Sequence, residues 1–252
     1  MLQPRNNHSI FSSQRNQTIN AGAATMDADA ARTFMTKVFS WMFIGLAITA
    51  FVAWAFASSP QLMSILFNQA GNLNLMGYVV MFAPFALVLL MSFRFQKMSS
   101  GTLTLMFGGY SILMGMSLSF ILLTFTASSV FQTFAVTAGM FGTMAIVGYT
   151  TKTDLTKFGA YLFMALIGLI LASIVNWMLR SEMLEYIISF VGVLIFTGLT
   201  AYDTQKLKRI GSGSESYGTE NTNKLVIMGA LTLYLDFINL FLFLLRFLGD
   251  RR

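Results

Sequence analysis

Cysteine is absent from this chain, and histidine, proline and charged residues are scarce. The 252 residues include no Cys, one His and three Pro, and charged residues make up 10% of them. The lack of Cys excludes disulfides, thiolate metal sites and cysteine nucleophiles, although it does not identify a redox compartment. The one histidine, His8, lies in a polar N-terminal segment. We therefore expect no histidine proton relay and no histidine metal ligand within the apolar segments.

Long uncharged intervals dominate the rest of the chain, of which 56% is hydrophobic. No charged residue occurs from Val38 to Phe93 or from Met98 to Thr151. Each interval is far longer than the roughly 20 residues that cross a bilayer, so each must hold two spans joined by an uncharged turn. The apolar runs are continuous, whereas a β-barrel strand would alternate in polarity. The sequence predicts an all-α integral membrane protein, a bundle of seven transmembrane helices near 38–57, 75–93, 102–124, 129–149, 159–178, 184–205 and 225–246.

The N-terminal segment has a different composition from the spans. Residues 1–33 are rich in Asn, Gln, Ser and Thr and contain no apolar run of signal-peptide length. This composition is typical of disorder rather than of a targeting signal. We expect residues 1–33 to form a disordered cytoplasmic tail and residues 34–252 to form the seven-helix membrane domain.

Basic residues indicate the orientation of the bundle. With the N-terminus in the cytoplasm, twelve of the sixteen Lys and Arg residues fall on the cytoplasmic side and four on the other. This bias follows the positive-inside rule, although the C-terminal Arg251 and Arg252 fall on the minority side. The net charge of +6 is then a signal of topology and of attraction to anionic lipid, not of nucleic-acid binding.

Small residues recur in the predicted spans and favour close helix packing, because lipid provides no hydrophobic drive between helices. We expect this role for Gly108, Gly109, Gly115, Gly139, Gly142, Gly168 and Ala172.

Two aspartates, Asp203 and Asp236, interrupt the last two apolar segments. An Asp at mid-bilayer costs roughly 2.5–3.5 kcal/mol even on lenient insertion scales, so such a residue is a functional candidate by default. Helical spacing places Asp236 on one stripe with Gly229, Thr232 and Asn239. It places Asp203 on another with Gly192, Phe196 and Thr200. We expect both stripes to face protein or water.

A simple count of residues along the two helices gives the two aspartates different depths in the membrane. The segment between their helices, GSGSESYGTENTN, is polar, so both belong to the inner half of an antiparallel pair. A rise of about 1.5 Å per residue puts Asp236 roughly 18 Å from Lys224, whereas Asp203 lies about one turn from the inner end of its helix. The two side chains meet only if the sixth helix sits deep or the seventh begins below the membrane surface.

Two segments carry a family resemblance. AYDTQKLK at 201–208 and LYLDFINLFLFLLRFLG at 233–249 closely resemble the signatures of the Bax inhibitor-1 family, also called the transmembrane Bax inhibitor motif family. The resemblance implies a fold with one central final helix wrapped by six others. It also implies an association with calcium leak and, in eukaryotes, with restraint of cell death. In this family the aspartates matching Asp203 and Asp236 form a proton-sensitive gate, and an arginine matching Arg94 latches onto them.

The chemistry of such a pair is consistent with this implication. Two carboxyl groups in contact at low dielectric cannot both ionise cheaply, so Asp203 and Asp236 should share a proton. Their oxygens are hard ligands of the kind that Ca²⁺ selects, but two carboxylates supply only part of its six to eight oxygens. We therefore expect a pH-sensitive calcium leak channel with a transient Ca²⁺ site and no resident cofactor. Thr200, Thr232 and Asn239 would form the supporting polar stripe. The direction of the pH effect stays open.

Other functions are compatible with parts of the sequence. An intramembrane aspartyl protease would need a GxGD motif, where this chain reads LYLD at 233–236, and a later Pro-Ala-Leu motif, although no proline follows Pro84. We therefore expect no enzyme activity. A membrane adaptor or regulator of a quality-control protease, and a proton-coupled cation exchanger, remain alternatives. The expected partners are the lipid bilayer, calcium ions, protons and, for the adaptor, a membrane protein. The expected location is a bacterial inner membrane.

Overall fold

The computed structural model describes residues 8–68 and 72–250, with side chains from Met26 onward. This part of the chain is almost entirely helical, and its elements follow in order. They are α1 (His8–Ser58), α2 (Pro60–Met63), α3 (Leu75–Arg94), η1 (Phe95–Lys97), α4 (Ser100–Thr124), α5 (Ala127–Thr150), α6 (Thr156–Leu179), α7 (Glu182–Ser212), η2 (Ser214–Tyr217) and α8 (Gly218–Leu248).

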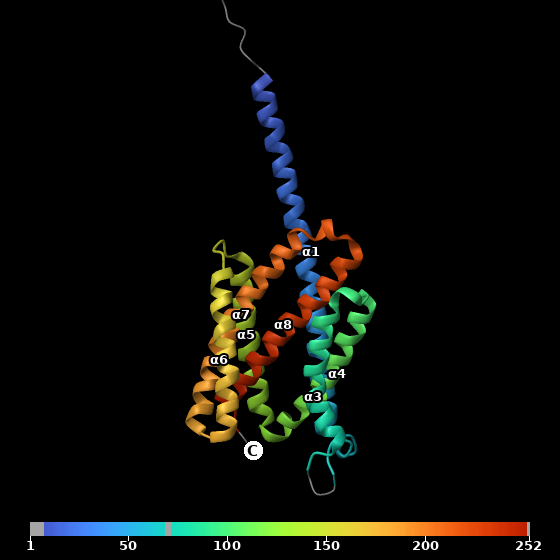
Figure 1. The fold of residues 1–252 in the computed structure, drawn as a ribbon, viewed down its shortest axis with the longest axis vertical. Coiled ribbons are helices and arrows are strands. Elements are labelled where there is room, and N and C mark those ends of the chain that lie inside the picture. The colour runs from blue at the N-terminus through green and yellow to red at the C-terminus, as the bar shows by residue number, and fades with distance from the viewer. Residues whose placement is uncertain (1–7, 69–71, 251–252) are drawn as a thin grey trace, which may run out of the picture.

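Seven of the described helices are long and apolar enough to cross a membrane. They are α1, α3, α4, α5, α6, α7 and α8, and each contains the core of one predicted span. This confirms the seven-helix membrane bundle. The helices run roughly side by side, while the N-terminal part of α1 projects well beyond the bundle (Figure 1).

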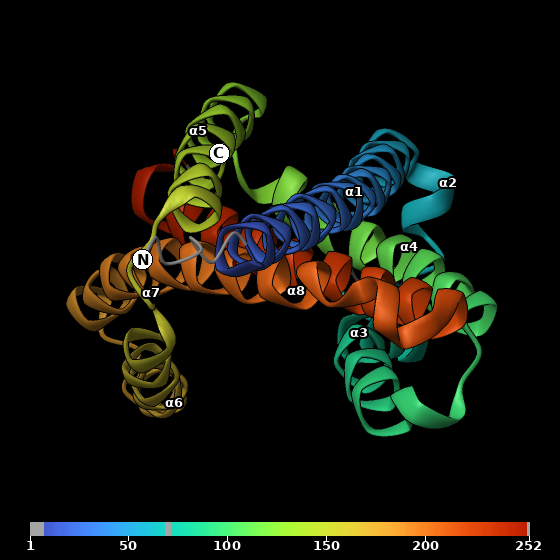
Figure 2. The same ribbon diagram turned by 90° about the horizontal axis from the view of Figure 1, so that it is seen from above.

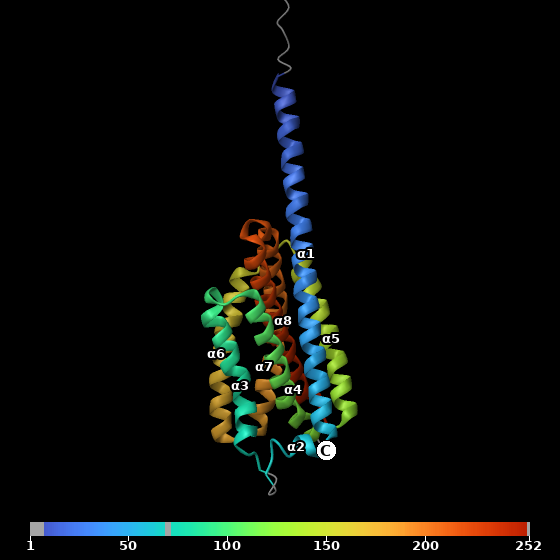
Figure 3. The same cartoon turned by 90° about the vertical axis from the view of Figure 1, so that its right-hand side faces the viewer.

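The last helix, α8, is the centre of the bundle, as predicted. It contacts α1, α4, α5 and α7, whereas α3 packs on α4 and α6 packs on α7. Seen from above, α8 crosses the width of the molecule (Figure 2). Together with α7 it separates α1 and α5 on one side from α3 and α6 on the other (Figures 2 and 3). Leu233, Tyr234 and Leu240 of α8 are fully buried in this core.

A buried polar contact joins the first and last spans. The hydroxyls of Tyr234 on α8 and Thr49 on α1 are 2.7 Å apart, and Thr49 also donates to the backbone oxygen of Ser111 on α4 at 2.9 Å. The ring of Tyr110 packs edge-on against Tyr234. Three helices therefore meet at one hydrogen-bonded point inside the apolar core.

The small residues divide into two groups, which partly corrects the sequence-based expectation. A Cβ added at Gly115 would collide with Val52 and the backbone of Thr49, so this glycine does allow close packing. Around Gly108, Gly109, Gly139, Gly142 and Gly168, however, no described atom lies within 4 Å of the Cβ position. No neighbouring helix therefore packs closely against these five glycines.

The N-terminal segment continues into the first membrane helix. α1 begins at His8, so helix occupies most of the segment 1–33 that the composition assigned to a disordered tail, and residues 1–7 lie outside the described residues. The Ala-rich sequence before Phe34 favours helix, and Ala31 is buried against Gly211 at the end of α7. Packing of α1 on the bundle thus starts before residue 34.

Candidate functional site

Asp203 on α7 and Asp236 on α8 face each other at the centre of the bundle. Each is 5% exposed, and their carboxyl groups lie within hydrogen-bonding reach of each other. An ionised carboxylate only accepts hydrogen bonds, so a bond between two carboxyl groups requires a proton on one of them. Among the described residues, Oδ2 of Asp236 is buried without a hydrogen-bond partner. The pair therefore keeps an oxygen that a proton or a cation can engage.

Both aspartates line one cavity of about 730 Å³, here called the aspartate cavity. Residues of α7 and α8 line it, together with α6 between Phe163 and Trp177 and with Phe85 of α3. This stretch of α6 corresponds to about 21 Å along the helix, which is most of the roughly 30 Å of membrane hydrocarbon.

The polar stripe expected on α8 lines this cavity. Thr232, Asp236 and Asn239 all contribute, and the side chains of Thr232 and Asn239 donate hydrogen bonds to backbone oxygens of their own helix. On α7 the stripe is less regular. Phe196 and Asp203 line the cavity, while Thr200 is fully buried and donates to the backbone oxygen of Phe196.

The difference in depth between the two aspartates is resolved by the length of α7 and the slope of α8. α7 continues to Ser212, so Asp203 lies about 13 Å from its end, not one turn from it. Asp236 lies about 27 Å from the start of α8 at Gly218. Because α8 crosses the bundle obliquely, this distance along its axis covers a smaller depth (Figure 1). The two side chains can therefore meet.

The cation beside the pair is Lys206 rather than Arg94. Lys206 lines the aspartate cavity, its charge acts on Asp203, and its Nζ lies over the ring of Tyr202 at 5.9 Å from the centroid. Arg94 is exposed at the end of α3, and no ion pair joins it to either aspartate among the described residues. The latch implied by the resemblance stays a prediction for another state. A signal for Lys206 was present in its spacing of three residues from Asp203.

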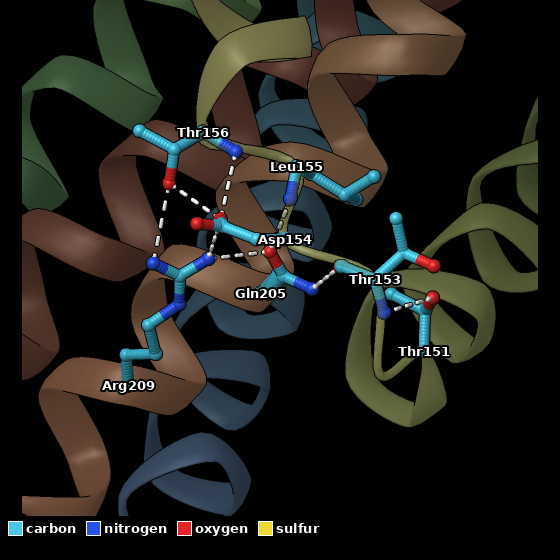
Figure 4. A network of polar contacts seen from close by, with 7 residues as sticks. All are labelled: Thr151, Thr153, Asp154, Leu155, Thr156, Gln205 and Arg209. Carbon is cyan, nitrogen blue, oxygen red and sulfur yellow. Dashed lines mark hydrogen bonds and ion pairs between the residues drawn. The ribbon is translucent and has the colours of Figure 1, made fainter.

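The sequence did not predict a polar network that lies next to the aspartate pair. Gln205 accepts hydrogen bonds from the backbone N–H of Leu155 (2.9 Å) and from Arg209 (2.6 Å), and it donates to the backbone oxygen of Thr153 (2.7 Å). Arg209 also forms an ion pair with Asp154 (2.5 Å). Figure 4 shows how this network, here called the Gln205 clamp, fastens the loop between α5 and α6 to α7. The clamp lies on the same helix as Asp203, two residues further along.

Asp154 is an exposed loop carboxylate with a defined role in this clamp. The hydroxyl and backbone N–H of Thr156 donate to it, and together with Arg209 they lower its pKa from 3.8 to about 2. Asp154 lies in the loop between α5 and α6. What the sequence did not indicate is its partner, because Arg209 is 55 residues away along the chain.

A second cavity continues the aspartate cavity. It has a volume of about 500 Å³, shares Ser173 and Trp177 with the aspartate cavity, and is lined further on by Asn176, Glu185 and Arg246. Glu185 lies in the first turn of α7 and Arg246 in the last turn of α8, so this outer cavity lies at the opposite end of the bundle from Lys206. The two cavities together follow most of α6 and α7 and the second half of α8.

Comparison with known proteins identifies relatives of the whole helical domain. A family model described as inhibitor of apoptosis-promoting Bax1 matches residues 31–252. Inner membrane protein YbhL of Escherichia coli K12 is 52% identical over 221 residues, which cover 88% of this chain and 93% of that protein.

Two further relatives come from distant bacteria. An uncharacterised protein of Borreliella burgdorferi is 46% identical over 219 residues, covering 87% of this chain and 92% of its own length. An uncharacterised membrane protein of Streptococcus pyogenes serotype M1 is 38% identical over 218 residues, covering 86% and 92%. The similarity therefore includes both aspartate-bearing helices and the five spans before them.

Proposed function

This chain belongs to the Bax inhibitor-1 family, and we propose that it is a calcium leak channel whose gate and pH sensor are Asp203 and Asp236. The contact between the two buried carboxyl groups on the floor of the aspartate cavity carries the proposal. A proton shared between them and a bound cation compete for the same oxygens, so the pair links cation passage to pH.

The arrangement of the cavities supports a path for cations. The aspartate pair, Thr232 and Asn239 form a polar strip in the otherwise mainly apolar lining of the aspartate cavity, and the outer cavity adjoins it through Ser173 and Trp177. Among the described residues no group of three or more His, Cys, Asp or Glu side chains gathers. We therefore propose a transient calcium site at the aspartate pair, which suits passage through the membrane rather than storage, and no catalytic role.

We further propose that the chain lies in a bacterial inner membrane with its N-terminus in the cytoplasm. The chain is a multi-pass membrane protein, and its E. coli relative is an inner membrane protein. In this orientation Arg209 and the Gln205 clamp lie at the cytoplasmic end, where the excess of basic residues is expected.

Calcium flux into proteoliposomes tests the channel. We expect the calcium flux of the wild type to change with pH between about pH 5.5 and pH 8. Either Asp203→Asn or Asp236→Asn should make the flux less dependent on pH. The double variant should flatten it no further, because the two groups share one proton. Asp154→Asn is the matched control, since it removes a carboxylate outside the membrane.

Two outcomes would overturn the proposal. If no variant and no wild-type sample passes calcium above empty liposomes, the chain is not a calcium channel. If calcium moves only when a proton gradient drives protons in the opposite direction, the aspartates belong to a proton-coupled exchanger.

One observation favours a second function. The N-terminal part of α1 projects beyond the bundle (Figure 1) and offers a helix to a membrane-protein partner, such as a quality-control protease. Deleting the projecting residues up to Thr25 should then remove partner binding and leave calcium flux unchanged. Loss of flux together with binding would contradict a separate adaptor role.

A further inference from the structure

Another large cavity, separate from the aspartate cavity and the outer cavity, lies on the opposite side of the bundle. It is an elongated groove of about 680 Å³ between α1 and α5, here called the α1–α5 groove, and Phe237 of α8 lies at its floor. α1 and α5 both pack on α7 and α8. They diverge from each other where the bundle is seen from above (Figure 2). We propose that this groove binds one acyl chain of an anionic phospholipid, with the lipid phosphate at Arg32.

The walls of the groove are apolar along nearly their whole length. Phe39 and Phe43 of α1 face Ala138, Gly142 and Ile146 of α5 across it. Because Gly142 carries no side chain and no described atom lies within 4 Å of its Cβ position, the glycine creates part of the space. An apolar groove between two membrane helices faces hydrocarbon, so water does not fill it.

Polar groups gather at one end only. Arg32, Thr36, Tyr149 and Thr150 line that end, and none of the described lining residues is acidic. Arg32 is exposed and is the one charged side chain among these lining residues. The positive charge of Arg32 at the mouth of an apolar groove complements a lipid phosphate, since basic pockets between transmembrane helices recognise anionic headgroups.

The dimensions fit one membrane leaflet. From Arg32 to Phe43 the groove follows α1 for about 16 Å, and from Thr150 to Ala138 it follows α5 for about 18 Å. Half of the hydrocarbon thickness is roughly 15 Å. The length of one leaflet and the positive charge at one end therefore favour an acyl chain with an anionic headgroup as the occupant.

Native mass spectrometry of the full chain, delipidated in detergent and titrated with phosphatidylglycerol or phosphatidylcholine, tests the site. We expect one phosphatidylglycerol per chain, bound more tightly than phosphatidylcholine. Gly142→Leu fills the groove and should abolish this binding. Arg32→Gln should reduce the preference for phosphatidylglycerol by about five-fold, because one cation near anionic lipid is worth about 1 kcal/mol.

Two matched variants control for general effects. Gly168→Leu makes the same substitution at another open glycine, on α6 outside the groove, and Lys157→Gln removes an exposed charge elsewhere. Both should bind lipid like the wild type. If Gly142→Leu does not fold, Ala138→Leu fills the groove from an exposed position on the same helix.

Three results would overturn the proposal. In the first, Gly142→Leu and Ala138→Leu retain the same lipid with the same affinity. In the second, Arg32→Gln leaves the lipid preference unchanged. In the third, filling the groove shifts a monomer–dimer equilibrium while the lipid count stays constant, which would make the groove an interface between copies of the chain.

Discussion

Lys206 lies one helical turn beyond Asp203 on α7 and provides the positive charge that acts on this carboxylate. The ammonium is exposed and borders the aspartate cavity over the ring of Tyr202. A cation tethered at this position competes with any cation that enters the cavity. Under the proposed function, Lys206 should therefore weaken the attraction of the aspartate pair for calcium.

Replacing Lys206 tests this competition. In Lys206→Met we expect the calcium concentration for half-maximal flux to fall by a factor between about 1.4 and 5, since exposed ion pairs are worth about 0.2–1 kcal/mol. Lys206→Arg should stay close to the wild type because it keeps the charge. Lys157→Met, an exposed lysine on α6 outside the cavity, is the control. A curve for Lys206→Met that superimposes on the wild type would show that this charge does not act on calcium entry.

The Gln205 clamp should determine how firmly the loop between α5 and α6 is held. Gln205→Leu removes three hydrogen bonds and leaves the backbone N–H of Leu155 without its acceptor. We expect a loss of about 1–3 kcal/mol in unfolding free energy and faster hydrogen exchange at residues 151–155. Gln205→Glu keeps the acceptor but not the donor, so its effect should be smaller.

The matched control for the clamp is Gln132→Leu, which removes an exposed glutamine that bonds only to Ser128 in the same helix. It should change the unfolding free energy by no more than about 0.5 kcal/mol and leave hydrogen exchange at residues 151–155 unchanged. Equal hydrogen exchange of the loop in Gln205→Leu and the wild type would mean that the clamp does not hold it.

Asp154 should not contribute to pH sensing near neutrality. Its pKa is lowered to about 2 in the folded protein, chiefly by hydrogen bonds from Thr156 and then by Arg209. Its contribution to stability is thus complete above its ordinary pKa of 3.8 and is lost only as the pH falls through about 2. The pH profile of calcium flux in Asp154→Asn should therefore match the wild type between about pH 5.5 and pH 8. A shifted profile would place a pH sensor in the loop.

The sequence predicts the fold class because charge scarcity and apolar length are direct consequences of the lipid solvent. It also locates Asp203 and Asp236, since a carboxylate in an apolar run stands out. Their meeting depends on the slope of α8, which no local pattern encodes. The sequence does not predict the role of Gln205, because polar residues are common near helix ends. Its partners lie in a loop about fifty residues away along the chain.

The glycines show the same division between composition and packing. Gly148 of α5 and Gly142, earlier in the same helix, look alike in the sequence. A Cβ at Gly148, however, would collide with the backbone of Ala201 on α7, two residues before Asp203, whereas Gly142 faces the α1–α5 groove. Only the tertiary contacts distinguish a packing glycine from one that leaves space.

Alanine substitution turns this difference into a measurement. Gly148→Ala should lower the unfolding free energy by about 1–3 kcal/mol, because the backbone of Ala201 cannot move aside as a flexible side chain would. Gly139→Ala should instead raise it by up to about 1 kcal/mol, since an open glycine in a helix gains helix propensity without a clash. Thermal or denaturant unfolding of both variants in the same detergent provides the comparison. If Gly148→Ala is as stable as Gly139→Ala, α5 and α7 are not packed closely at this point, and the position of Asp203 relative to α5 would have to be revised.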